Sequence, residues 1–132
     1  MIRVHETTPS LAAAMERLNI RNAAAIEVDN VIYLSGLTAV DVASGELIGG
    51  GIREHARHTL ELYRTILVDI GLSLDHVVKV NAYLADAADF AAWNEEYLAV
   101  FEPPYPCRTT VTAPPVFGLI EVELVAARQA RR

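Results

Sequence analysis

Two apolar, β-branched runs near the start of the chain predict a β-hairpin. They cover residues 23–28 and 31–35 and are separated by Asp29 and Asn30, which both tolerate positive φ. Residues 2–5 predict a short edge strand before the hairpin. The first part of the chain is therefore expected to contribute neighbouring strands to one sheet.

The apolar period changes to between three and four residues after a glycine-rich loop over 41–51. One helical face then carries Ile52, Ala56, Leu60, Tyr63, Leu67 and Ile70. Gly71 follows as a helix stop. The opposite, solvated face carries Arg53, Glu54, Arg57, His58, Glu61 and Arg64. A shorter helix, capped by residues 7–10, is expected to end at Leu18.

The second half of the chain predicts a strand, a helix and two further strands. In the strand over 76–84, alternation separates two faces, with Val78, Val80, Ala82 and Leu84 on one and Val77, Lys79, Asn81 and Tyr83 on the other. The helix over 86–101 has a buried stripe of Phe90, Trp93, Tyr97 and Val100. Prolines in 103–106 end the helix, and strands follow over 107–112 and 119–127.

This order of elements predicts a single α+β domain over residues 1–132, with two substantial helices on one mostly continuous sheet. Two helices can cover only one face of that sheet. The other face is expected to display Val31, Tyr33, Val77 and Tyr83, which is too apolar for exposure to water. Hydrophobic residues also make up 52% of the chain. Both observations predict a partner subunit on the helix-free face.

The charge balance limits the class of partner. The chain has 17 acidic and 11 basic residues, a formal net charge of -6 and a single lysine, Lys79. Nucleic-acid binding needs clustered basic side chains and is therefore disfavoured. The apolar runs are too short for a transmembrane helix, so no membrane partner is expected. The one cysteine, Cys107, excludes an intrachain disulfide, which is typical of a cytoplasmic protein.

The candidate chemistry centres on Arg108, an arginine inside a β-branched strand. A partly buried guanidinium needs an anion, and its planar fork suits a carboxylate. Glu121 and Glu123 share one face of the last strand. If the last two strands pair, Arg108 and one of these glutamates could face the same cavity. The spacing alone allows two interpretations of the two side chains, a ligand-binding site or a structural Arg–Glu ion pair. Which glutamate faces the cavity also stays open, because a bulge would change the face.

Other chemistry-bearing residues fit structural roles. His55 and His58 have a spacing that can bind metal, but no further ligand cluster joins them, so a solvated helix face is preferred. Cys107 is interpreted as a small buried strand residue. Residues 49–51 lack the Lys-Ser/Thr pair of a phosphate-binding loop. No metal or cofactor is predicted.

Four segments carry a resemblance to a known family. They are VIYLSG (31–36), DHVVKVNAYL (75–84), FAAWNEEY (90–97) with Phe101, and PCRTTV (106–111) followed by IEVEL (120–124). In order and spacing they resemble the Rid/YjgF family of enamine/imine deaminases, also called L-PSP endoribonucleases. The resemblance implies a chorismate-mutase-like α+β fold. It also implies a homotrimer whose sheets form a central barrel, with ligand clefts between neighbouring subunits.

The resemblance also implies roles for individual residues. Arg108 matches the arginine that holds the substrate carboxylate, and Glu121 matches the glutamate that positions the attacking water. The other matching cleft positions are Ser35, Gly36, Asn94 and Cys107, the last through its backbone groups. Residues 1–22 diverge from the family. The segment 18–22 replaces a Gly-Pro-Tyr stretch whose tyrosine closes the cleft, and its Arg21 can add a second cation.

The implied activity is hydrolytic deamination of reactive 2-imino or 2-enamino acids to 2-oxo acids and ammonia, without a cofactor. The alternative is a non-catalytic protein of the same fold that binds small carboxylates. The ribonuclease or translation-inhibitor activity of the older family name fits less well, because the chain is acidic and has one lysine.

Overall fold

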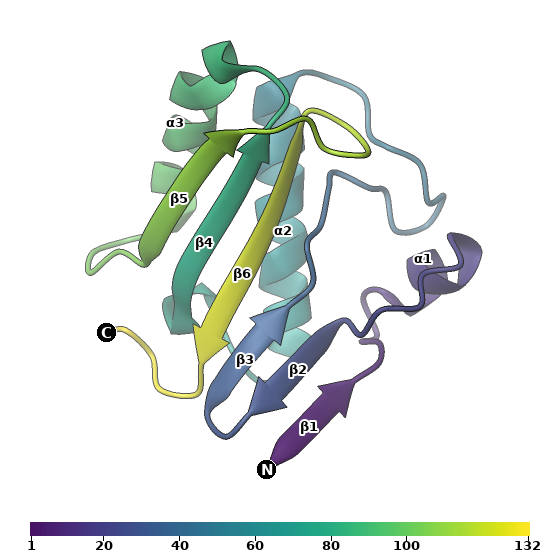
Figure 1. Ribbon diagram of the computed structural model, residues 1–132, viewed down its shortest axis with the longest axis vertical. Coiled ribbons are helices and arrows are strands. Elements are labelled where there is room, and N and C mark those ends of the chain that lie inside the picture. The colour runs from purple at the N-terminus through teal and green to yellow at the C-terminus, as the bar shows by residue number, and fades with distance from the viewer.

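The computed structural model describes residues 1–132 as one six-stranded mixed sheet with two long helices on one face (Figure 1). This confirms the predicted α+β architecture. Two 3-10 turns, Leu74–His76 and Ala87–Asp89, flank the fourth strand. In chain order, the strands and helices are β1 (Ile2–His5), α1 (Ala12–Arg17), β2 (Ala25–Val28), β3 (Val31–Leu34), α2 (Ile52–Asp69), β4 (Val77–Leu84), α3 (Phe90–Val100), β5 (Cys107–Thr112) and β6 (Ile120–Ala127).

The strand order across the sheet is β1-β2-β3-β6-β4-β5. Only β4 and β5 are parallel, because α3 provides the crossover between them. The last two strands, β5 and β6, do not pair, since β4 lies between them, so the condition for a shared cavity of Arg108 and a β6 glutamate is not met within the chain. At eight residues each, β4 and β6 are the longest strands, and both present alternating apolar side chains to the helices. Both lie inside the sheet, with a neighbouring strand on each side.

One side chain of β4 lies on the face opposite to that expected. The register shifts between Val77 and Lys79, and this irregularity turns Val77 toward the helices, where it is fully buried. Lys79, Asn81 and Tyr83 remain on the helix-free face as predicted.

The core lies between the sheet and the helices α2 and α3. Its largest fully buried side chains include Trp93, Tyr63 and Phe101. Phe90 was expected in this core, but it is 43% exposed. It is the first residue of α3, and its ring lies over the guanidinium of Arg108 instead.

The first helix begins without the expected side-chain cap from residues 7–10. Leu11 occupies the N-cap position of α1, and no side chain bonds the free backbone N–H groups there. The carbonyl of Thr8 accepts hydrogen bonds from the backbone N–H groups of Leu11 and Ala12, each at 2.9 Å. A turn of backbone therefore replaces the cap.

The histidines of α2 face protein and not solvent. His55 is buried with its Nε2 3.2 Å from the Ile48 carbonyl, and the Nε2 of half-buried His58 lies 2.8 Å from the Val40 carbonyl. The prediction of a solvated face is wrong at these two positions, because the loop after β3 folds back against α2.

None of the helices combines the length and the hydrophobicity needed to span a bilayer.

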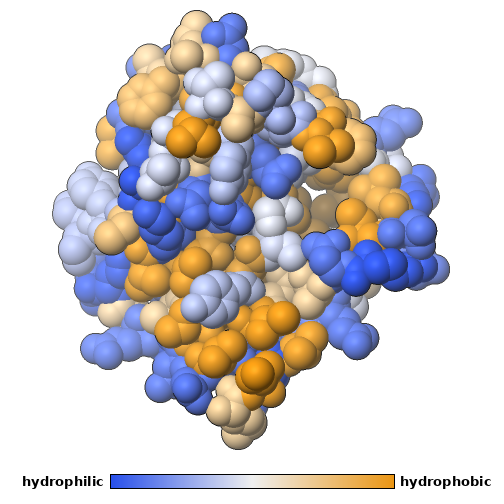
Figure 2. Space-filling view, viewed as in Figure 1, coloured by the Kyte–Doolittle hydropathy of each residue, from blue (hydrophilic) through white to orange (hydrophobic).

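The helix-free face carries an apolar patch over β1, β2 and β3, in the lower part of Figure 2. Strand pairing places its members side by side: Ile26 opposes Tyr33, and Val28 opposes Val31. Tyr33 is 54% exposed. We call this surface the sheet patch, and it consists of Ile2, Val4, Ile26, Val28, Val31 and Tyr33.

Candidate functional site

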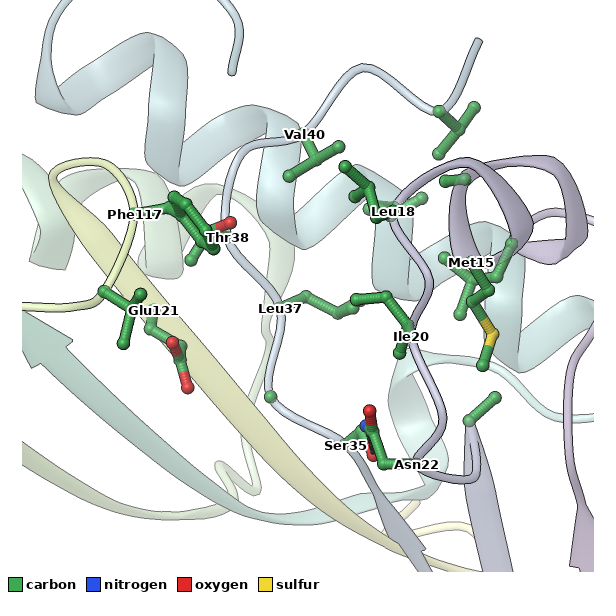
Figure 3. A pocket seen from close by; sticks show the side chains of 17 residues that line it. Met15, Leu18, Ile20, Asn22, Ser35, Leu37, Thr38, Val40, Phe117 and Glu121 are labelled. Atoms are coloured by element: carbon green, nitrogen blue, oxygen red, sulfur yellow. Dashed lines mark hydrogen bonds between the residues drawn. The ribbon is translucent and has the colours of Figure 1, made fainter. Parts of the chain in front are cut away.

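A cavity of about 320 Å³ lies between α1, the chain that leaves β3 and the turn that enters β6 (Figure 3). Its polar side chains are Glu121, Ser35, Asn22 and Thr38, and most of the remaining lining is apolar. We call it the Glu121 cavity. It contains three of the residues predicted for the site, namely Ser35, Gly36 and Glu121.

The position of the Glu121 carboxylate depends on the absence of a side chain at Gly36. A Cβ atom built on Gly36 would lie 2.7 Å from Oε2 of Glu121. The chain beyond Gly36 stays next to β6, because Leu37 and Val122 exchange two backbone hydrogen bonds of 2.8 and 2.9 Å. Glu121 itself makes no hydrogen bond or ion pair within the chain, so its oxygens are free to accept protons from a ligand or from water.

Tyr63 holds this corner of the sheet from the helix side. Its hydroxyl lies 2.6 Å from the carbonyl oxygens of both Ser35 and Val122. Burial raises the pKa of Tyr63 well above its usual value, so the phenol keeps the proton that it donates there. The Ser35 hydroxyl is also engaged, because it donates to the Ala23 carbonyl at 2.6 Å and accepts from Asn22 Nδ2 at 2.9 Å.

Of the two glutamates in β6, only Glu121 lines the cavity. Glu123 Oε1 accepts hydrogen bonds from the Tyr83 hydroxyl and from Asn81 Nδ2. The hydrogen bond to Glu123 raises the pKa of Tyr83, because it stabilises the protonated phenol. Glu123 therefore has partners on the helix-free face, whereas Glu121 does not.

Arg108 lies in a second group of residues, on the helix-bearing side of β5. Its Nη1 donates to Asn94 Oδ1 at 2.7 Å, and its guanidinium carbon is 4.4 Å from the centroid of the Tyr97 ring. The Trp93 indole N–H donates to Thr110 Oγ1 at 3.2 Å and ties α3 to the same strand. We call Arg108, Asn94, Tyr97 and Phe90 the Arg108 cluster.

The Arg108 cluster is suited to binding an anion. Arg108 forms no ion pair with any carboxylate of the chain, and one amide oxygen uses only one of its five N–H donors. Burial raises the pKa of Tyr97, although the nearby positive charge of Arg108 opposes this shift. The face of the neutral phenol ring therefore packs against the Arg108 guanidinium. The remaining donors can take a planar carboxylate.

The structure does not bring Arg108 and Glu121 into one cavity within the chain. Arg108 and Thr110 point toward α3, whereas Glu121 alternates with Ile120 and Val122, which are buried beneath the helices. The two side chains therefore lie on opposite faces of the sheet. This excludes both the shared cavity and the structural Arg–Glu pair within a single chain.

Two other predicted positions also lie elsewhere. Cys107 is exposed at the start of β5, contrary to the expectation of a buried residue, because β5 is an edge strand and this residue alternates with inward-facing Arg108. Arg21 does not line the Glu121 cavity. It lines a neighbouring groove with Glu6 and Glu16.

The aromatic members of the Arg108 cluster, Phe90 and Tyr97, are not among the site residues predicted from the sequence. The predicted buried stripe is confirmed for Trp93 and Tyr97 but not for Phe90. The signal for the cluster is the i, i+4, i+7 spacing of Phe90, Asn94 and Tyr97, which defines a single helix face. The cavity wall from α1 and residues 18–22 had no comparable signal, because it forms only when this segment folds against β3.

Comparison with known proteins identifies relatives. The family model described as endoribonuclease L-PSP matches residues 14–128. A 2-iminobutanoate/2-iminopropanoate deaminase of Capra hircus is 39% identical over 106 residues, which cover 79% of this chain and 77% of the relative. The crystal structure of RidA from an Antarctic Psychrobacter is 36% identical with a TM-score of 0.74, covering 80% and 86% of the two chains. Escherichia coli TdcF with bound serine is 28% identical with a TM-score of 0.73, covering 81% and 87%.

Proposed function

The chain belongs to the Rid/YjgF/L-PSP family, and from this membership we propose that it hydrolyses 2-imino acids, and the 2-enamino acids that tautomerise to them, to 2-oxo acids and ammonia. The observation that carries the proposal is the cation of Arg108, which has no carboxylate partner in its own chain. A 2-imino acid supplies that carboxylate next to an electrophilic C=N carbon. Imine deaminases among the relatives support this substrate class.

The active unit in this proposal is a homotrimer. The sheet patch is an apolar surface that a neighbouring subunit would cover. Association would also allow the Arg108 cluster of one subunit to meet the Glu121 cavity of its neighbour, which two faces of one sheet cannot do. The family resemblance supports the trimer with clefts between subunits.

In the proposed mechanism, Arg108 binds and orients the substrate. Its guanidinium holds the carboxylate through two N–H donors, while Asn94 and the Tyr97 ring fix its direction. Arginine stays protonated in proteins, so it cannot serve as the base. Ser35, Gly36 and the backbone near Cys107 would complete the cleft around the substrate.

Glu121 would act as the general base and then as the general acid. Its free carboxylate accepts a proton from water as the water oxygen bonds to the imine carbon. The C=N electron pair moves to nitrogen, and the nitrogen takes that proton from the Glu121 carboxyl group. A tetrahedral carbinolamine results. Glu121 then carries the proton of the new hydroxyl to the nitrogen. The C–N bond breaks, ammonia leaves, and the deprotonated oxygen becomes the carbonyl of the 2-oxo acid. Glu121 ends in its starting state.

The proposal is tested with short-lived imines generated in place by an amino-acid oxidase. Wild type is expected to accelerate their decay, and Arg108→Ala is expected to lose on the order of 100-fold or more in kcat/KM, because the carboxylate loses its charged partner. Arg64→Ala is the matched control, since Arg64 pairs only with Glu61 on the exposed face of α2. Equal decay with wild type and Arg108→Ala would refute the deaminase.

A second candidate function is binding of a small carboxylate without catalysis. The bound serine of the TdcF structure favours it, because it shows that a relative holds an amino acid. Saturable binding of a 2-oxo acid with no acceleration of imine decay would support this function. RNA cleavage that survives Arg108→Ala and falls with added salt would instead support a ribonuclease.

A further inference from the structure

We propose that the apolar wall of the Glu121 cavity receives the substrate side chain, so that this protein prefers 2-imino acids with branched or longer aliphatic side chains over 2-iminopropanoate. This inference rests on the proposed function and adds a substrate class to it. The wall is defined by Met15, Leu18, Ile20, Leu37 and Val40.

The cavity has a polar end and an apolar end. Glu121, Gly36 and Ser35 come from the corner where β3 meets β6, whereas Met15, Leu18 and Ile20 come from α1 and the segment that follows it. Figure 3 shows Ile20 and Leu37 pointing toward one another, with Leu18 and Met15 on the same side as Ile20. A substrate with its C=N carbon at Glu121 would extend its side chain into this apolar end.

The size of the cavity favours a side chain larger than methyl. Its volume of about 320 Å³ is within the range of pockets that hold whole small molecules, so a single methyl group would leave most of the wall without contact. Each methylene moved from water into an apolar environment strengthens binding by about fourfold. A four-carbon branched side chain therefore has a clear advantage here.

Two apolar residues of the wall remain accessible to a ligand. Leu18 is 44% exposed and Ile20 is 36% exposed, and both line the cavity. The segment that carries them is tied to the site by the hydrogen bond from Asn22 to Ser35. An apolar lining held next to a free carboxylate fits a ligand with one apolar and one polar end.

The first arm of the test measures equilibrium binding of two stable 2-oxo acids, pyruvate and 4-methyl-2-oxopentanoate, by calorimetry. Wild type is expected to bind the larger acid at least about tenfold more tightly. Ile20→Asn is expected to remove most of this ratio, because it places an amide in the wall. The control Val68→Asn makes the same kind of change at a 64% exposed position of α2 outside the cavity and is expected to keep the wild-type ratio.

The second arm compares kcat/KM for imines made from leucine and from alanine. The expected result is the same preference and the same loss of preference in Ile20→Asn. Hydrolysis of both imines with equal efficiency, together with equal binding of both 2-oxo acids, would overturn the inference and leave the deaminase intact. Cavity filling by a neighbouring subunit would produce that same equality. Selective, Ile20-dependent binding without any imine hydrolysis would refute the deaminase and keep the side-chain pocket.

Discussion

The Arg108 cluster and the Glu121 cavity lie on opposite faces of the same sheet and contain side chains of opposite charge. In the cluster, a cation is already oriented by an amide and an aromatic ring, and it has no counterion. In the cavity, a carboxylate without a partner borders a mostly apolar space. Each region therefore contains one unpaired charge, and the charges are of opposite sign.

Under the proposed function, each chain would therefore carry two separate halves of a site. β-strand alternation sends Arg108 toward α3 and Glu121 to the helix-free face, and no rotamer change exchanges the faces of a strand. A ligand that needs both charges must be bound between copies.

Subunit complementation is the most direct test of a divided site. Arg108→Ala and Glu121→Gln are each expected to be inactive alone. When the two are unfolded and reassembled together in equal amounts, about one quarter of the interfaces would combine an intact Arg108 with an intact Glu121, so activity returns to about that fraction of wild type. Each variant reassembled with itself is the control. No recovery in verified mixed trimers would mean that the site is not shared.

The two glutamates of β6 allow activity to be separated from stability. Glu121→Gln is expected to lower kcat by about 100-fold or more while changing the free energy of unfolding by less than about 0.5 kcal/mol, because Glu121 has no partner to lose. Glu123→Gln is expected to cost about 1–2 kcal/mol of stability through its contacts with Tyr83 and Asn81, with a small effect on kcat. Denaturant unfolding and imine kinetics on both variants check this. The reverse pattern would move the catalytic role to Glu123.

Titration of Tyr97 gives the smallest effect and reports on the Arg108 cluster alone. Burial raises the pKa of Tyr97, while the positive charge of Arg108 favours the ionised phenol and so lowers it. Arg108→Ala is therefore expected to raise the pKa of Tyr97 further. Ultraviolet titration of wild type and Arg108→Ala, each compared with its Tyr97→Phe counterpart, isolates this residue. A downward shift would show that the two groups are not in contact in solution.

Local sequence patterns predicted most helices, strands and turns, because the formation of each of these depends mainly on residues close together in the chain. The β-hairpin around Asp29, whose φ is 54°, and the helix α2 ending before Gly71, whose φ is 81°, formed as expected. The predictions were wrong where contacts with residues distant in the sequence determine the position of a side chain. Val77 changed face at a strand irregularity, and Phe90 left the core to cover Arg108. His55 became buried because a loop folds onto it.

Periodicity and turn residues are local properties, so the sequence was sufficient to predict the α+β class and an apolar helix-free face. Side-chain chemistry likewise indicated the residue types of the candidate site. The tertiary structure alone decided that β4 separates β5 from β6, and hence that Arg108 and Glu121 lie on opposite faces. It also decided which glutamate stays free and which apolar residues border it. These outcomes depend on strand order and on contacts between distant segments, where the lowest free energy is set by the packing of the whole sheet against its helices.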